Sequence, residues 1–509
     1  MSHPARKLAS GSALRFTNLV ATALVSVLIM PFVVRTLGDR MYGVWALVAT
    51  FIGYYGVLDL GLAKATSRYL AGALGSNDQE ECNRVFNTGL RLYLGLGGLV
   101  LACTMLGALL APLFCKSPQD ASLFAKLIVI LGLNLSLQFP LRIYTGALEG
   151  HLRFDRTASL DLMTLVLRTA LIILVLKAGY GVEGLAWVTF LSCLPSVALT
   201  VYFTKRELPF LRCDFKNYWR RHTARVLFSY SFYSFIAQMA DILRFQVDNL
   251  VVAGVVGLAA VTHYSVGGKL ARTYMDIVLT LLGVFISVFS RKEGARDYEG
   301  LRRTFLFATR LSVCLSSFVG FGMVVWGRPF IQRWMGPSYL DGYTCLVALV
   351  PGTMVALWQS PSVSLMYGVS KHKFLAFSAA IEGVVNLALS IMLARKYGIV
   401  GVALGTTFPL LASKIFVQPV YVCRIAGIGY LDYLRRMGRT ILSVILALVL
   451  PTLLTVKFVA PDYKMLTLVG TLSALAYAAT LWRLEFSPGE TNLLRQVIWP
   501  RLAVRRGGE

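Results

Sequence analysis

The chain has 509 residues, of which 56% are hydrophobic and only 15% are charged, and its mean hydropathy is +0.66. Soluble globular proteins carry about 25% charged residues, so this composition excludes water as the main solvent. The net charge of +25 does not indicate a nucleic-acid partner, because the basic clusters lie between apolar runs, where inner-leaflet lipid attracts them.

Apolar stretches of about 20 residues, the length that crosses a bilayer as a helix, recur along the chain. We therefore predict an all-α integral membrane protein with about fourteen transmembrane helices. The predicted spans are 13–35, 43–65, 86–111, 122–148, 159–176, 184–204, 226–255, 263–288, 304–327, 341–367, 374–394, 400–423, 440–459 and 465–482.

A short motif occurs twice, each time between two apolar runs. Tyr180 to Ala186 reads YGVEGLA, and Tyr397 to Ala403 reads YGIVGVA, 217 positions later. Other pairs keep nearly the same spacing: Gly38 with Gly257, Arg84 with Arg303, and Gly150 with Gly368. The repeat predicts two six-helix lobes related by a pseudo-two-fold axis along the membrane normal, followed by two extra helices.

This repeat divides the chain into five parts. We expect an N-lobe over 1–204, a basic cytoplasmic linker over 205–225, a C-lobe over 226–423, helices 13 and 14 over 424–482, and a cytoplasmic tail over 483–509. Most loop Lys and Arg residues fall on one side if the N-terminus is inside, which predicts an N-in, C-in topology. The first apolar run is expected to be retained as a helix.

Several charged residues fall within predicted spans, where a central Arg or Lys costs about 2.5–3.5 kcal/mol unless it faces protein or water. Residues three, four or seven apart share a helix face. Polar stripes of this kind are Arg15, Asn18 and Thr22 in span one; Asn134, Gln138 and Arg142 in span four; and Ser265, Lys269, Arg272 and Asp276 in span eight. Such stripes point into a cavity or across a helix contact.

Other intramembrane charges could neutralise one another. Arg244 lies at helical spacing from both Asp241 and Asp248 in span seven, and Asp161 and Arg168 lie seven apart in span five. These groups fit either a substrate or proton role or a purely structural one.

The carboxylate of Asp59 in span two is either a proton carrier or the counter-ion of Lys64 or Arg15. Glu382 and Asn386 form a weaker pair of the same type in span eleven, and Lys414 is a further cation inside a span.

The chemistry of an enzyme is missing from the sequence. No GxxxxGK[ST] loop binds ATP, no large outer loop carries paired carboxylates, and the five His form no metal motif. We therefore expect a transporter with no catalytic residues, no metal and no cofactor.

The opening helix with its break at Leu37-Gly38-Asp39 precedes the segments Gly43-Val-Trp-Ala and Val57-Leu-Asp-Leu-Gly-Leu. With Gly146-Ala-Leu-Glu-Gly and the two repeated breaks, these segments resemble the polysaccharide flippases of the multidrug/oligosaccharidyl-lipid/polysaccharide exporter superfamily. The resemblance covers roughly residues 10 to 425.

The resemblance implies a protein of the bacterial inner membrane. Its substrate would be an undecaprenyl-diphosphate-linked oligosaccharide, moved outward by alternating access for surface polysaccharide biosynthesis. Membrane lipids, a polysaccharide polymerase and glycosyltransferases would be its partners. Family members carry basic residues in a central cavity, and the candidates by position are Arg15, Lys64, Arg244, Lys269 and Arg272, to which Arg142 and Arg168 are added. Asp59, Asp241, Asp248 and Asp276 are the candidates for coupling or counter-ion roles, while Asn18, Asn134 and Gln138 would line the cavity.

Coupling to protons, to sodium or to the membrane potential stays open. Two other functions also stay open. A multidrug or cation exporter of the same superfamily predicts an acidic cavity and commonly twelve spans. A membrane-embedded polysaccharide polymerase predicts a sizeable outer domain, which the sequence lacks.

Overall fold

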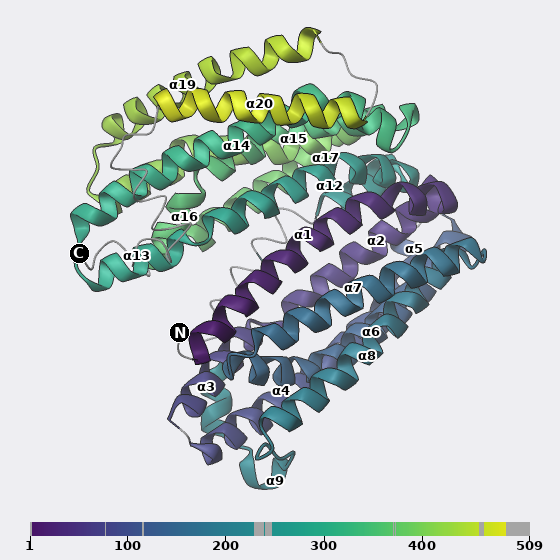
Figure 1. Ribbon diagram of the computed structural model, residues 1–509. Coiled ribbons are helices and arrows are strands. Elements are labelled where there is room, and N and C mark those ends of the chain that lie inside the picture. The colour runs from purple at the N-terminus through teal and green to yellow at the C-terminus, as the bar shows by residue number, and fades with distance from the viewer. Residues whose placement is uncertain are drawn as a thin grey trace. The chain divides into compact units, whose positions relative to one another are not determined.

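The computed structural model describes residues 3–76, 78–114, 117–228, 239, 247–369, 371, 373–457 and 463–484. All regular elements within these ranges are helices (Figure 1). The chain divides into two compact units, Met1–Thr262 and His263–Glu509. The first unit therefore extends beyond the predicted linker, because residues after 247 pack on α2 (Asp39–Tyr55), where Asn249 Nδ2 donates to Thr50 Oγ1 at 3.0 Å.

In the first unit α6 lies against α3, α4 and α8, and α7 lies against α1 and α8. In addition to α2, the helices of this unit are α1 (His3–Leu37), α3 (Leu62–Gly75), α4 (Gln79–Leu109), α5 (Ala111–Phe114), α6 (Pro118–Gly150), α7 (Phe154–Lys177), α8 (Gly181–Glu207), α9 (Phe215–Tyr218) and α11 (Asp248–Val251), the last followed by a π turn over Val252–Val256. The next helix, α12 (Leu258–Leu282), begins in this unit and continues into the second.

In the second unit α15 packs against both α14 and α17, and α19 packs against α14 and α20. The helices are α13 (Phe285–Gly294), α14 (Tyr298–Trp334), α15 (Leu340–Trp358), α16 (Ser360–Gly368), α17 (Lys373–Ala412), α18 (Gln418–Ala426), α19 (Tyr430–Lys457) and α20 (Tyr463–Leu484). A 3₁₀ turn spans Pro337–Tyr339 and a π turn spans Ser413–Val417.

Ten stretches of the described chain are long and apolar enough to cross a membrane. One of them, Phe377–Ala426, contains two predicted spans, eleven and twelve. Span seven falls mostly outside the described residues, and span thirteen lies in α19. The multi-pass character is confirmed, whereas the count of fourteen stays a prediction.

The predicted second span is not one helix. It breaks after Tyr55 into a 3₁₀ turn over Gly56–Asp59, and α3 begins at Leu62 after two residues with positive φ, Leu60 and Gly61. Span ten is also broken: α15 ends at Trp358, and Pro361 lies in the first turn of α16.

The repeated glycines have matching backbone conformations. Gly181 has φ of 61° and Gly398 has φ of 57°, while Gly38 and Gly257 combine positive φ with ψ of 162° and 167°. Only glycine adopts such angles without strain. Each break therefore contains a glycine with positive φ at the same position of the motif, and Gly398 is the non-helical residue inside α17.

The helices that follow the two matched loops also begin alike. Asp78 caps the N-terminus of α4 by accepting from the backbone amide of Glu81, and Asp297 caps α14 by accepting from that of Gly300. One turn later, Arg84 pairs with Glu80 and Arg303 pairs with Glu299. Cap and ion pair thus recur together at a spacing of 219.

Gly150 and Gly368 occupy equivalent contacts. A Cβ atom on either would lie within 3.4 Å of a neighbouring helix, α3 in the first unit and α13 in the second. The neighbouring atoms of Gly150 are the carbonyl O of Ser67, the Cβ of Leu70 and the amide N of Ala71. Those of Gly368 are the carbonyl O of Ile286, the Cβ of Phe289 and the amide N of Ser290, so the same three kinds of atom occur in both places. These matches are what a duplication predicts. The symmetry of the two lobes stays a prediction.

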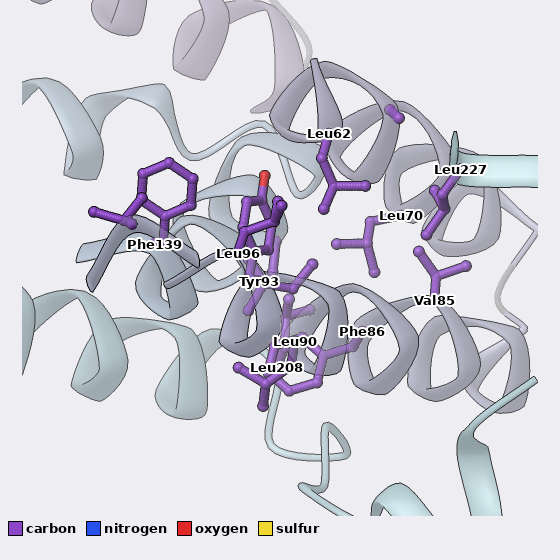
Figure 2. Close-up of a cluster of buried hydrophobic side chains, with 14 residues drawn as sticks. Leu62, Leu70, Val85, Phe86, Leu90, Tyr93, Leu96, Phe139, Leu208 and Leu227 are labelled. Atoms are coloured by element: carbon purple, nitrogen blue, oxygen red, sulfur yellow. The ribbon is translucent and has the colours of Figure 1, made fainter. Parts of the chain in front are cut away.

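The core of the first unit is centred on α3, α4 and α6. Figure 2 shows Leu70, Phe86 and Tyr93 in this cluster, all of them at most 1% exposed. Leu208, from the predicted linker, packs into the same cluster.

The linker is held to α4 by two asparagines one turn apart. The side chain of Asn83 donates to the carbonyl of Phe210 and accepts from the amide of Arg212. Asn87 does the same with the carbonyl of Arg212 and the amide of Asp214, at 2.7 Å each. Residues 210–214 are thus bound to the first unit through their backbone.

Candidate functional site

A polar cavity of about 420 Å³ lies inside the first unit, between α1, α6, α7 and α8. Its volume lies in the range of about 300–1,000 Å³ that is typical of ligand pockets. The lining residues are Asn18, Thr22, Gln138, Leu141, Arg142, Thr145, Glu149, Thr157, Leu160, Asp161, Thr164, Leu165, Arg168, Cys193, Ser196, Val197 and Thr200.

Three groups of residues that the sequence singled out meet in this cavity. Asn18 and Thr22 come from α1, Gln138 and Arg142 from α6, and Asp161 and Arg168 from α7. Each group follows helical spacing on its own helix, so one face of each helix contributes to the lining.

Arg142 forms an ion pair with Asp59, at 3.0 Å from Nη1 to Oδ1. The Asp59 side chain is only 6% exposed, while that of Arg142 is 35% exposed and lies over the ring of Phe139. The carboxylate of Asp59 also accepts from the amide of Ala63 at 3.3 Å, at the start of α3. Asp59 is therefore a counter-ion, but its described partner is Arg142 and not one of the two cations proposed from the sequence.

Asn134 lies just behind the cavity wall and is buried. Its Oδ1 accepts from Gln138 Nε2 at 2.8 Å and from Cys193 Sγ at 2.9 Å. Arg168 Nε donates to Ser192 Oγ at 3.3 Å on α8. These bonds fix the side chains that project from α6 and α7.

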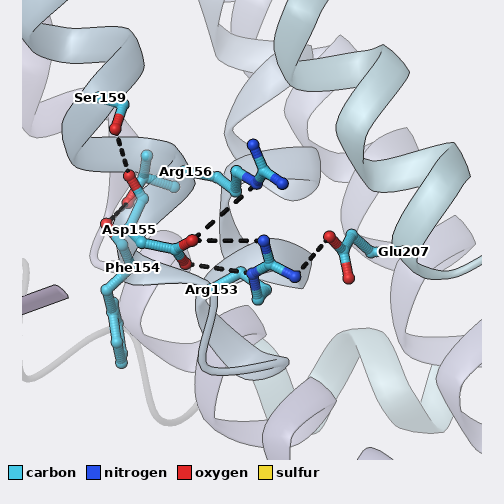
Figure 3. A network of polar contacts seen from close by, with 7 residues as sticks. Arg153, Phe154, Asp155, Arg156, Ser159 and Glu207 are labelled. Carbon is cyan, nitrogen blue, oxygen red and sulfur yellow. Dashed lines mark hydrogen bonds and ion pairs between the residues drawn. The ribbon is translucent and has the colours of Figure 1, made fainter. Parts of the chain in front are cut away.

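A network of charges joins two helices that line the cavity. In the predicted topology, the helix ends that it joins lie on the cytoplasmic side. Arg153, just before α7, pairs with Asp155 at 3.1 Å and with Glu207, at the end of α8, at 2.5 Å (Figure 3). Arg156 lies 3.9 Å from the same Asp155 carboxylate. The ends of α7 and α8 are therefore linked by charge as well as by packing.

The predicted stripe of span eight lies on α12. Arg272 pairs with Asp276 at 3.2 Å, one helical turn apart, and both side chains are about half exposed. Lys269 lies on the same helix, in the part of α12 that belongs to the second unit.

Some predicted site residues lie outside the described part of the chain. Asp241 and Arg244 are among them, so their pairing with Asp248, a buried residue at the start of α11, stays a prediction. Arg15 lies in α1 and Lys64 in the first turn of α3, but their side chains are outside the described atoms.

Sequence reasoning missed one pair of charges in the second unit. Glu382 Oε2 accepts from Lys414 Nζ at 3.1 Å, and both side chains are at most 5% exposed. Each residue was recognisable as a charge within a span, but nothing in the sequence paired them. It also missed Glu149 and all of the cavity threonines except Thr22, namely Thr145, Thr157, Thr164 and Thr200.

Comparison with known proteins gives the family. The family model described as polysaccharide biosynthesis protein matches residues 33–343. The uncharacterised membrane protein EpsK of Bacillus subtilis is 23% identical over 81% of this chain and 82% of its own length. A Shigella flexneri protein provisionally named an O-antigen transporter is 21% identical over 79% of this chain and 96% of its own length.

Two solved structures share the fold. An inward-facing multidrug resistance transporter of the MATE family has a TM-score of 0.72 at 17% identity, over 82% of this chain and 98% of its own. The lipid II flippase MurJ, in an inward closed conformation, has a TM-score of 0.67 at 16% identity, over 93% of this chain and 98% of its own. Because the family model spans more than half of the sequence, the chain belongs to the polysaccharide biosynthesis protein family.

Proposed function

We propose that this protein moves an undecaprenyl-diphosphate-linked oligosaccharide across the bacterial inner membrane by alternating access, for the synthesis of a surface polysaccharide. The observation that carries the proposal is the polar cavity enclosed by four helices of a membrane-spanning unit. A large polar headgroup cannot cross hydrocarbon unassisted, and a polar cavity replaces its contacts with water.

The same proposal includes an N-in, C-in topology, with the loops before α7 and after α8 on the cytoplasmic side. Glycosyltransferases would supply the substrate there, and a polymerase would use it outside. For the driving force we propose the membrane potential, with proton antiport and sodium antiport as the other candidates. Moving about two negative charges outward would gain up to roughly 4.6 kcal/mol per 100 mV, at about 2.3 kcal/mol per charge.

The test is a translocation assay in proteoliposomes that hold the purified full chain and a fluorescently labelled undecaprenyl-diphosphate oligosaccharide. We expect the label to become accessible to an external quencher faster than in protein-free vesicles. An imposed potential, negative on the side from which the substrate leaves, is expected to accelerate it.

Arg168→Gln should slow translocation at least tenfold, and Lys269→Ala with Arg272→Ala should abolish it while the protein still inserts. Wild-type vesicles that export a cationic dye but leave the glycolipid in place would overturn the proposal in favour of a multidrug exporter.

A further inference from the structure

We propose that the cavity in the first unit binds an uncharged sugar of the substrate and that the diphosphate is bound elsewhere. This inference rests on the proposed function and divides the substrate between two places. The cavity would then select substrates by their sugar chain and not by their lipid carrier.

The charge of the cavity wall does not suit a diphosphate. Among its described side chains, the cations of Arg142 and Arg168 are balanced by the carboxylates of Glu149 and Asp161. Arg142 is further neutralised by Asp59 at 3.0 Å. A diphosphate requires a surplus of cations that donate charge-assisted hydrogen bonds, and the described side chains of this wall supply no such surplus.

The hydrogen-bonding character of the wall points the same way. Thr164 and Thr200 donate their hydroxyl protons to the carbonyls of Leu160 and Ser196, at 2.8 and 2.7 Å. Because the proton of each is used within its own helix, the hydroxyl oxygen is left as an acceptor. Gln138 likewise donates its amide to Asn134, which leaves its carbonyl oxygen as an acceptor.

A wall rich in acceptors selects a ligand rich in donors. Every free hydroxyl of a sugar carries a proton to donate, and the carboxylates of Glu149 and Asp161 are the strongest acceptors in the cavity. A diphosphate at neutral pH offers almost only acceptor oxygens. Outside the guanidinium groups of Arg142 and Arg168, the acceptors of this wall therefore suit a polyol better than a diphosphate.

Two positions of the second unit that correspond to the cavity wall carry charged side chains. At the 217-residue spacing of the two repeated breaks, the cavity residues Leu165 and Val197 correspond to Glu382 and Lys414. Those two side chains form the buried ion pair at 3.1 Å. At these two positions the second unit thus has a pair of charged side chains where the first unit has apolar side chains on the cavity wall.

The experiment compares two kinds of probe binding to the purified full chain by calorimetry. One is farnesyl diphosphate, which has no sugar. The other is farnesyl diphosphate joined to glucose, galactose, N-acetylglucosamine or N-acetylgalactosamine, of which the tightest is used. We expect this glycosylated probe to bind wild-type protein at least tenfold more tightly than farnesyl diphosphate.

Two isosteric variants locate the sugar. Asp161→Asn should weaken the glycosylated probe about ten- to a hundredfold, and Thr164→Val should weaken it about three- to tenfold, as expected for losing a charged and a neutral hydrogen bond. Neither should change the affinity for farnesyl diphosphate by more than twofold. Thr169→Val is the matched control, because Thr169 lies on α7, bonds to the Leu165 carbonyl at 2.7 Å and does not line the cavity.

Equal weakening of both probes would overturn the inference, since it would put the diphosphate in the cavity. So would a glycosylated probe that binds no more tightly than farnesyl diphosphate, or variants with wild-type affinity for both. Failure of the proposed function is recognised separately, because the wild-type protein would then not translocate the labelled glycolipid in vesicles.

Discussion

The ammonium group of Lys414 lies 3.1 Å from the carboxylate of Glu382 in a place where both side chains are almost completely hidden. An unpaired charge in such a place is strongly unfavourable, whereas an uncharged pair of similar volume is often tolerated. Removing only one of the two charges should therefore destabilise the second unit, whereas removing both together should cost much less.

This relationship gives the first prediction. Lys414→Met alone should destabilise the protein by about 3–5 kcal/mol, because it leaves the Glu382 carboxylate buried without its cation. Adding Glu382→Gln should restore most of that loss. Thermal unfolding in detergent, followed by the exposure of buried cysteines to a maleimide dye, measures both variants. Additive losses in the double variant would show that the two charges act independently.

The pair between Asp59 and Arg142 gives a second prediction, because it joins stability to transport. Asp59→Asn should lower the melting temperature, since it leaves the Arg142 guanidinium beside a neutral amide. Asp59→Asn with Arg142→Gln should recover the melting temperature but not translocation, because Arg142 also lines the cavity. Melting curves and the vesicle assay separate these effects. Full transport in the double variant would exclude Arg142 from the substrate path.

The two glycines of the repeated motif give a third prediction. Gly181→Ala and Gly398→Ala should each destabilise by about 1–2 kcal/mol, because their φ angles of 61° and 57° are unfavourable for alanine. Gly56→Ala is the control: Gly56 has φ of −57°, and a Cβ there meets nothing within 4 Å. Denaturant unfolding should show this control unchanged or slightly stabilised. Equal losses at all three positions would contradict the prediction.

The bonds from Asn83 and Asn87 to the linker give a fourth prediction. Replacing both with Ala removes four hydrogen bonds that hold residues 210–214. Trypsin should then cleave after Arg212 or Lys216 at least tenfold faster, since each bond is worth about 1 kcal/mol. Asn217→Ala, within the linker itself, is the control. Unchanged cleavage would mean that packing of Leu208 alone holds the segment.

The cap of α14 gives a prediction for pH. The hydrogen bond from Lys292 lowers the pKa of Asp297 below its ordinary value of 3.8, and the amide of Gly300 lowers it further. Because the pKa of Asp297 is lower in the folded state, its charged carboxylate stabilises the folded protein fully at pH values above the ordinary pKa. This stabilisation is lost as the pH falls through the lower pKa of the folded state. Asp297→Asn should therefore flatten the decline of melting temperature below about pH 4. Glu293→Gln, nearby, should leave the decline as steep as in the wild type.

Much of the fold could be predicted from the sequence, because apolar length fixes where helices cross a membrane and glycine fixes where they break. The breaks at Gly181 and Gly398 are examples. The break between α2 and α3 was missed, because the apolar run continues through the 3₁₀ turn at Gly56–Asp59.

The cavity could be predicted only in part. Helical spacing showed that Gln138 and Arg142 share a face, and that Asp161 and Arg168 do too. It could not show that α1, α6, α7 and α8 surround one space, because periodicity carries no information on which helices are neighbours. For the same reason the pairing of Asp59 with Arg142, and of Glu382 with Lys414, required the structure.

The attachment of residues 210–214 to α4 makes this stretch of the predicted linker a part of the first unit. Lys205, Arg206 and Glu207 belong to the last turn of α8, so they are not a loose connector either. The basic side chains of Lys205, Arg206 and Arg212 therefore extend from a backbone that α8 and α4 hold in place.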